Sequence, residues 1–310
     1  MVSVTEPVTV LYIGGAGRSG STLLDMLLGN TPSFFSIGEA RFFWEYMERG
    51  DLLCGCGAPL RECEFWSPIY FSLAEQGLNL SRLASLNRRL NRTRNTYWAS
   101  GNISRKLAPA LTELTQATGA LYKLIATVSG ATVIVDSSKV PSHFAILRQI
   151  EEIDLRALHL VRDGRAVAYS WSKRPKKEFA KMSLPATMPQ HSLFRSIMTW
   201  AIENAFIARL EKKRPYAIMR YEDFTQDPYV EIQKALTTLG LNRFGVDNLY
   251  ETGLVLKPTH SVGGNPIRFT TREAFIKPDM EWREKMPRSV KIILWLLVMP
   301  MMRRYGYFMR

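Results

Sequence analysis

Short runs of apolar residues, separated by turn residues and by longer helical segments, set the pattern of this chain. Four runs predict buried strands, at residues 8–13, 131–135, 155–161 and 216–221. The intervening segments predict helices over residues 20–28, 164–172, 192–213 and 228–239. Strands that alternate with helices predict a parallel sheet covered on both faces, in which ligands bind beyond the carboxyl ends of the strands.

Two regions interrupt this alternation. Residues 81–98 and 102–129 are predicted to be helical, and they follow a turn-rich stretch at residues 59–68. Residues 173–190 are rich in proline and lysine, which predicts a mobile surface loop. We therefore expect an α/β fold in which the whole chain forms one P-loop-like domain, with insertions near residues 50–130 and in the 173–190 loop.

The composition adds an anionic partner to this picture. The 310 residues are 46% hydrophobic, enough for a sizeable core, and they carry a net charge of +13. A chain this basic favours contact with nucleic acid, a membrane surface, a phosphorylated cofactor or an acidic substrate. Residues 81–106 hold seven basic and no acidic side chains, but no nucleic-acid-binding motif accompanies them. We expect a solvated helix face there and no nucleic-acid partner.

Both ends of the chain bear on its location. The first nine residues lack a basic start and run straight into a strand, so we expect no signal peptide. The longest apolar run, residues 292–302, is shorter than the roughly 20 residues that span a bilayer. We therefore expect a cytoplasmic protein. Because basic residues flank this run, it either contacts anionic lipids at a membrane surface or forms a final helix packed on the core.

A glycine-rich loop joins the first strand to the first helix, with the sequence Gly15-Ala16-Gly17-Arg18-Ser19-Gly20-Ser21-Thr22. Backbone N–H groups at the start of a helix form an anion site. The spacing nearly matches the nucleoside-triphosphate pattern, but Ser21 stands where that pattern has its lysine. This disfavours a kinase or NTPase. Arg18 supplies the cation instead, and its planar fork suits phosphate or sulfate. An ordinary tight turn is the alternative.

A second anion site is predicted where the third strand ends. Arg162 follows this strand directly, and Ser170 lies about two turns into the next helix. Whether both side chains reach one anion depends on the bend at Gly164. The alternative is a surface arginine that caps a strand, with Ser170 as an ordinary helix residue.

Together these segments resemble the sulfotransferases that use 3'-phosphoadenosine-5'-phosphosulfate (PAPS), in the form common to carbohydrate, tyrosylprotein and bacterial-type members. Residues 17–22 resemble the family's 5'-phosphosulfate loop, and residues 161–170 resemble its 3'-phosphate motif. Residues 220–224 and 263–268 resemble further family segments. The resemblance covers most of the chain.

The resemblance implies one α/β domain around a five-stranded parallel sheet. It implies transfer of a sulfonate from PAPS to a hydroxyl group of a sugar, lipid or small-metabolite acceptor, which leaves 3',5'-ADP. The implied nucleotide-binding residues are Gly17, Arg18, Ser19, Gly20, Ser21 and Thr22 at the 5'-phosphosulfate, Arg162 and Ser170 at the 3'-phosphate, and Tyr221 and Arg268 from the later segments.

Sulfonate transfer calls for a base, a cation and no metal. The acceptor hydroxyl is a weak nucleophile, so a general base helps it. Glu39 is the candidate, since it follows the first helix and resembles the family's glutamate base. Arg18 is the candidate catalytic cation at the leaving oxygen, where charge builds, and Lys139 is a candidate catalytic cation that faces the donor or the acceptor. His143 and His260 are alternative bases, and a surface pair of Glu39 with Arg41 is the structural alternative.

Two features argue for other functions. Asp136 ends the second predicted strand, where an NTPase would hold Mg²⁺. Cys54, Cys56 and Cys63 offer three zinc ligands, but the sequence shows no obvious fourth, and structural zinc sites usually have four. We expect a thiol-rich turn and no bound metal. The rival functions are a P-loop kinase or NTPase, and a non-catalytic protein that binds anions or membranes.

Overall fold

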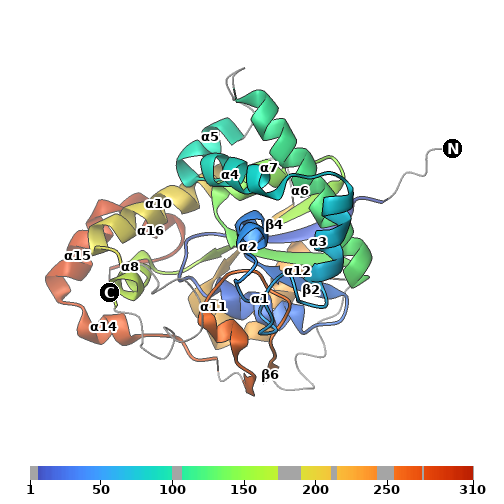
Figure 1. Cartoon of the computed structure of the whole chain (residues 1–310). Coiled ribbons are helices and arrows are strands. Elements are labelled where there is room, and N and C mark those ends of the chain that lie inside the picture. Colours follow the sequence, from blue (N-terminus) through green and yellow to red (C-terminus); the bar gives the residue numbers. More distant parts are fainter. Residues whose placement is uncertain are drawn as a thin grey trace.

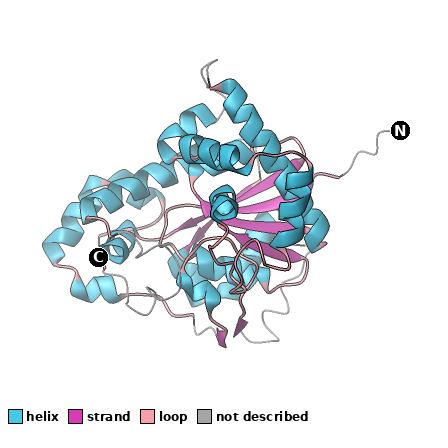
Figure 2. Ribbon diagram, in the orientation of Figure 1, coloured by secondary structure: helices cyan, strands magenta, loops and turns pink. Residues whose placement is uncertain are grey.

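Five parallel strands form one central sheet in the computed structural model, which describes residues 6–99, 107–173, 190–210, 215–242, 255–273 and 276–309. Their order across the sheet is β2-β3-β1-β4-β5. Helices surround this central sheet (Figures 1 and 2). The strands are β1 (Val8–Gly14), β2 (Phe34–Gly38), β3 (Val133–Lys139), β4 (Ile153–Val161) and β5 (Tyr216–Arg220). The expected α/β fold with a five-stranded parallel sheet is confirmed.

Both faces of the sheet are buried, which explains why the strands read as continuous apolar runs. Val10 and Tyr12 of β1 point into one hydrophobic cluster, whereas Leu11 and Ile13 point into the other. This alternation follows from the two-residue period of a strand. The chain must therefore supply helices for two faces.

The helices form three groups (Figure 1). Two groups cover the two faces of the sheet, and the third forms a separate hydrophobic cluster. The first face of the sheet is covered by α2 (Phe43–Arg49), α3 (Trp66–Glu75), α4 (Leu80–Leu90), α6 (Ala108–Ser129) and α7 (Pro141–Leu147). The second face is covered by α1 (Ser21–Gly29), α11 (Tyr221–Gln226) and α12 (Pro228–Thr238). The third group is α8 (Gly164–Ser172), α10 (Leu193–Leu210), α14 (Glu281–Lys285), α15 (Arg288–Leu297) and α16 (Met299–Arg304).

Short elements complete the described part of the chain. They are the helical turns η1 (Ala40–Phe42), η2 (Thr93–Asn95), α5 (Thr96–Ala99) and η3 (Pro266–Phe269), and an antiparallel strand pair, β6 (Val255–Leu256) and β7 (Arg272–Glu273).

Most predicted elements are confirmed, and the departures have local causes. The predicted helix over residues 81–98 breaks at Asn91, whose backbone leaves the helical region and whose side chain donates to Asn87 and His143. The strand predicted over residues 131–135, ending at Asp136, begins at Val133 and runs on to Lys139. Trp66 already begins α3, inside the stretch expected to be turns. The loop expected at residues 173–190 falls almost wholly outside the described residues.

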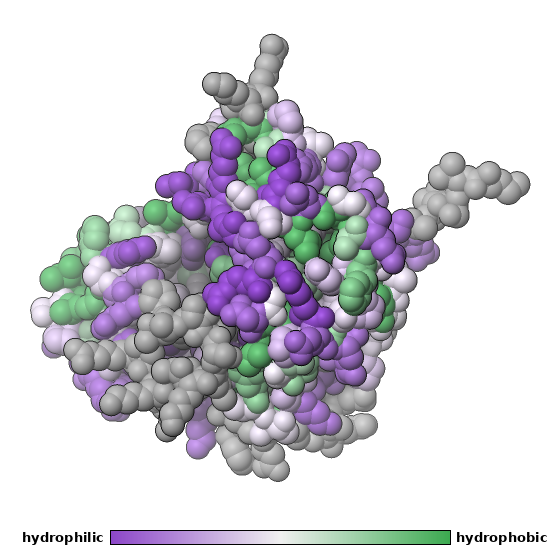
Figure 3. Space-filling model, viewed as in Figure 1, coloured by the Kyte–Doolittle hydropathy of each residue, from purple (hydrophilic) through white to green (hydrophobic). Residues whose placement is uncertain are grey.

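The C-terminal apolar run folds into α15 and α16 rather than one helix. Leu294, Trp295 and Met302 pack into a cluster with α8 and α10, as the core alternative expected. Ile293 and Leu296 face outward and are 56% and 58% exposed. Figure 3 shows apolar side chains at the surface at this end of the molecule. Among the described residues, no helix combines the length and apolar character needed to cross a membrane.

Candidate active site

The glycine-rich loop leaves the end of β1 and enters α1 through backbone shapes that require glycine. Gly15 has a φ of 131°, and a Cβ on it would lie 2.3 Å from the Leu160 carbonyl oxygen. Gly20 caps α1 with a φ of 92°, and a Cβ there would lie 2.7 Å from the Tyr221 ring. The loop therefore packs against β4 on one side and Tyr221 on the other, and its backbone N–H groups lie at the start of α1.

The side chain of Arg18 lies at the predicted 3'-phosphate residues. Its backbone is left-handed, with a φ of 71°. Its Nε donates to Ser170 Oγ at 3.0 Å, and its guanidinium lies 5.6 Å from the Trp171 ring centroid. The structure thus brings Arg18 to Ser170, and its expected role at the leaving group stays a prediction.

Arg162 joins the same group from the carboxyl end of β4. It is only 5% exposed, and its guanidinium stacks 4.3 Å from the centroid of the Tyr221 ring. One terminal nitrogen donates to the Arg18 carbonyl oxygen at 3.1 Å, and the other lies 3.2 Å from an Asp279 carboxylate oxygen. Among the described residues, its Nε has no hydrogen-bond partner.

Two neighbouring arginines, Arg162 buried and Arg18 partly buried, make this end of the sheet a candidate anion site. Burial lowers the pKa of Arg18, and the charge of Arg162 lowers it further. Like charges removed from water repel each other, so a bound anion would stabilise both. Ser19 adds a buried hydroxyl that finds no partner in the described structure.

Glu39 forms a second polar centre on the other side of the loop. It follows β2, and its carboxylate lies 2.7 Å from Lys139 Nζ at the end of β3. Lys139 also has a left-handed backbone, with a φ of 69°, and its carbonyl oxygen accepts from Gly15 N at 3.2 Å. Lys139 therefore links the glycine-rich loop to Glu39. Arg41, the partner considered earlier for Glu39, lies over Phe42 instead.

A late loop closes this centre. A Cβ on Gly264 would lie 3.8 Å from both Glu39 Oε1 and Thr22 Oγ1, and 4.0 Å from Arg268 Cδ. Arg268 is 1% exposed, and it donates to the Leu53 carbonyl oxygen at 2.9 Å. Its Nε and Nη1 have no partner among the described residues. The late loop therefore brings buried N–H donors close to the expected base.

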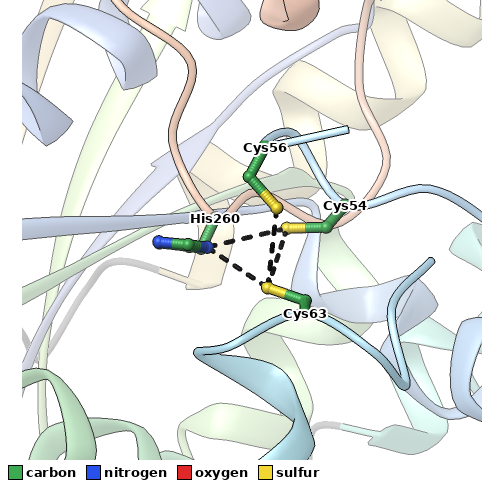
Figure 4. A group of neighbouring side chains, drawn as sticks. All are labelled: Cys54, Cys56, Cys63 and His260. Atoms are coloured by element: carbon green, nitrogen blue, oxygen red, sulfur yellow. Dashed lines mark hydrogen bonds between the residues drawn. The ribbon is translucent and has the colours of Figure 1, made fainter. Parts of the chain in front are cut away.

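The residue considered for magnesium binding and the two alternative bases make other contacts in the structure. Asp136 is fully buried and accepts from Ser138 and Tyr122. His143 Nε2 lies 3.3 Å from it, and His143 Nδ1 accepts from Asn91. Asp136 and His143 thus fix the end of β3, which disfavours both a magnesium role and a base role. His260 lies among the cysteines (Figure 4).

Glu203 of α10 lies at the site, and sequence reasoning missed it. Its carboxylate lies near Thr93 and the backbone of Gly17, both of which favour its ionised form. Removal from water raises the pKa of Glu203 to about 7, while Arg41 and Lys139 oppose this shift. A carboxylate that titrates near neutral pH beside the loop is a candidate acid or base. No local pattern in α10 distinguishes Glu203 from a surface residue.

The comparisons with known proteins identify the family. The model of the sulfotransferase family matches residues 11–244, more than half of the chain, and the protein belongs to this family. Among proteins with curated annotation, none matches the chain.

Solved structures with a similar fold are sulfotransferases. The sulfotransferase domain of the curacin biosynthetic pathway is 16% identical, with a TM-score of 0.49 over 95% of this chain and 98% of that one. The sulfotransferase domain of the Synechococcus PCC 7002 olefin synthase is 20% identical, with a TM-score of 0.49 over 99% and 98%. A sulfotransferase from Alicyclobacillus acidocaldarius is 13% identical, with a TM-score of 0.43 over 97% and 94%. Likeness this distant carries no argument about chemistry, and the family rests on the sequence match.

Proposed function

We propose that this sulfotransferase uses PAPS as donor and transfers its sulfonate to a hydroxyl group of an acceptor. The observation that carries the proposal is the group formed by buried Arg162 with partly buried Arg18 and Ser170 beside the glycine-rich loop. A nucleotide with phosphate only at its 5' position needs one anion site. A second site with two neighbouring guanidinium groups fits the 3'-phosphate that distinguishes PAPS.

The loop N–H groups and the start of α1 would hold the 5'-phosphosulfate. Ser21 lies at the first position of this helix, and Thr22 Oγ1 accepts from Asn265 N at 3.4 Å. Tyr221 would keep the Arg162 guanidinium flat against its ring, so that the N–H groups of Arg162 face the ligand. Arg268 would add the donors that it does not use within the described structure.

In the proposed reaction, the acceptor oxygen attacks sulfur as the bond from sulfur to the bridging oxygen breaks. The bonding electrons go to the nucleotide phosphate, and the acceptor proton goes to the Glu39 carboxylate. Lys139 orients the Glu39 carboxylate through their ion pair, and in this proposal it also faces the developing charge. The products are a sulfated acceptor and 3',5'-ADP. The sulfonate carries less charge than a phosphoryl group, so the proposed chemistry requires no metal.

Calorimetry with 3',5'-ADP and ATP separates this function from its rivals. We expect tight binding of 3',5'-ADP and weak binding of ATP, without Mg²⁺. Preferred binding of Mg²⁺-ATP would instead support an NTPase. Incubation with labelled PAPS and pools of hydroxylated lipids, sugars and small metabolites then identifies the acceptor class. Failure to bind either nucleotide would overturn the enzyme assignment.

The exposed face of α15 fits an anionic lipid surface, which we include in the proposal as a peripheral contact. Ile293, Leu296 and Leu297 are exposed, and Arg288 and Arg303 flank them. Apolar residues with basic neighbours bind membrane interfaces. The wild type should sediment with phosphatidylserine vesicles, whereas the double variant Ile293→Glu/Leu296→Glu should not. Equal sedimentation of two folded proteins would reject the contact.

A further inference from the structure

The three cysteines of the chain meet one histidine from a distant segment (Figure 4). Cys54 and Cys56 lie in the loop that follows α2, and Cys63 precedes α3. His260 comes from the segment that follows β6, about 200 positions later in the chain. One ligand atom from each of the four residues lies within 4.8 Å of the other three. This completes the set that lacked a fourth ligand in the sequence.

Four of the six distances between these atoms are close to those of a tetrahedral zinc site. A tetrahedron with Zn–S bonds of about 2.3 Å and a Zn–N bond of about 2.0 Å has S···S edges of about 3.8 Å and S···N edges of about 3.5 Å. Cys63 Sγ lies 3.6 Å from Cys54 Sγ and 3.7 Å from Cys56 Sγ. His260 Nδ1 lies 3.2 Å from Cys63 Sγ and 4.0 Å from Cys54 Sγ. Shifts of a few tenths of an ångström would bring these edges to the ideal values.

The surroundings hold the histidine ring in the orientation that a metal requires. The ring stacks on Phe65 with a centroid distance of 5.5 Å, and this contact fixes its plane. Its other nitrogen, Nε2, lies 3.6 Å from a carboxylate oxygen of Glu64. Metal-bound histidines commonly donate their second N–H to a carboxylate. The main chain also turns tightly between the thiols, since Gly57 N donates to Cys54 O at 2.9 Å.

We propose that Cys54, Cys56, Cys63 and His260 bind one zinc ion. Four protein ligands leave no open coordination position, so the ion is structural and takes no part in the sulfonate transfer. A disulfide between Cys56 and Cys63 is the competing chemistry of this cluster. It would require the two sulfur atoms to move from 3.7 Å to about 2.05 Å apart and would remove two of the four ligands.

The proposed zinc ion joins two loops, and backbone hydrogen bonds connect one of these loops to Glu39, the expected base. Trp66 Nε1 donates to the His260 carbonyl oxygen at 2.7 Å. Two residues further on, Val262 N donates to Ile37 O at 2.9 Å, and Val262 O accepts from Glu39 N at 2.6 Å. The late loop with Gly263, Gly264 and Arg268 begins there. This positioning role rests on the proposed function, whereas the metal site itself does not.

The first test is the metal content of the full chain, purified without a metal-affinity tag under reducing conditions. Mass spectrometry of the metals should find about one zinc ion per chain. Titration of the thiols with a mercurial reagent should release that zinc as the three thiols react. Replacement of zinc by Co²⁺ should give the visible absorption of tetrahedral thiolate coordination. This last measurement needs no variant, so it holds even if substitutions unfold the chain.

Variants assign the ligands. Cys56→Ser and His260→Gln should lose zinc, while the matched control His191→Gln, outside the cluster, should keep it. Hydrogen exchange at residues 259–268 should rise in Cys56→Ser, while exchange in α12 should stay unchanged. Zinc-free protein that takes up neither Zn²⁺ nor Co²⁺ would overturn the site, as would an intact mass two hydrogens lower. Binding of 3',5'-ADP to the same preparations shows separately whether the proposed function holds.

Discussion

Substitution of Arg162 tests whether the chain distinguishes a 3'-phosphorylated nucleotide. The variant Arg162→Ala removes the buried guanidinium that stacks on Tyr221 and contacts both Arg18 and Asp279. If Arg162 holds the 3'-phosphate, the variant should lose affinity for 3',5'-ADP and keep most of its affinity for 5'-AMP. The comparison of two ligands is essential because Arg162 also donates to the Arg18 carbonyl oxygen in the loop.

The size of the effect follows from the contacts of Arg162. A hydrogen bond to a charged group contributes about 1.5–3 kcal/mol. Each 1.4 kcal/mol corresponds to about a tenfold change in Kd, so the loss should lie between about 10-fold and 150-fold for 3',5'-ADP. Any shift of the loop weakens both nucleotides equally and cancels in the ratio of their Kd values. Arg162→Lys keeps the charge but loses the fork, and it should fall between the wild type and Arg162→Ala.

Isothermal titration calorimetry of both nucleotides measures this ratio, and thermal unfolding reports whether each variant is folded. Arg156→Ala is a matched control on β4, the strand that precedes Arg162, since Arg156 pairs with Asp154 at 2.7 Å and not with the loop. It should leave both Kd values unchanged. If Arg162→Ala is folded and weakens the two nucleotides by the same factor, the 3'-phosphate assignment is refuted.

Three further predictions concern carboxylates. Glu39→Gln should lower kcat by about 10²- to 10⁴-fold with unchanged 3',5'-ADP binding, and normal turnover in steady-state assays would move the base role to Glu203. Asp279→Asn should tighten 3',5'-ADP binding in calorimetry, because its carboxylate competes with the nucleotide for Arg162; weaker binding would contradict this. Burial raises the pKa of Asp25 to about 7 from 3.8, so the wild type loses stability as pH rises between these values. The free energy of unfolding of Asp25→Asn, measured with urea, should therefore rise relative to that of the wild type by about 2–3 kcal/mol between pH 5 and pH 8. If the difference between the two proteins does not change with pH, the buried charge at Asp25 is refuted.

The sequence predicted the elements whose signals are local. The glycine-rich loop can be recognised from consecutive residues, and so can β4 with Arg162 directly after it. Once the order of strands and helices is known, the topology places both at one end of the sheet. β2 was missed as a strand because Phe34–Gly38 is a short edge strand that contains Ser36 and ends at glycine. Only the family resemblance supplied a fifth strand.

Contacts between distant segments could not be predicted in this way. Lys139 was expected to face the donor or the acceptor, and its ion pair with Glu39 depends on how β2 and β3 lie in the sheet. Glu203 reaches the loop because α10 packs across α8, and no periodicity in α10 marks that position. The contact of His260 with the cysteines depends on the fold of the whole chain, so no local pattern in the sequence marks it.

The left-handed backbone at Arg18 and Lys139 lowers the stability of this protein, whereas the proposed function requires the side chains of both residues. A residue with a side chain pays about 1–2 kcal/mol in that conformation, and glycine does not. Selection for heat resistance alone would therefore favour glycine at both positions and discard two cations of the proposed site. If the proposed function holds, an engineering campaign that ranks variants by melting temperature would enrich proteins that are more robust and inactive. Retaining Arg18 and Lys139 requires a screen that scores turnover together with stability.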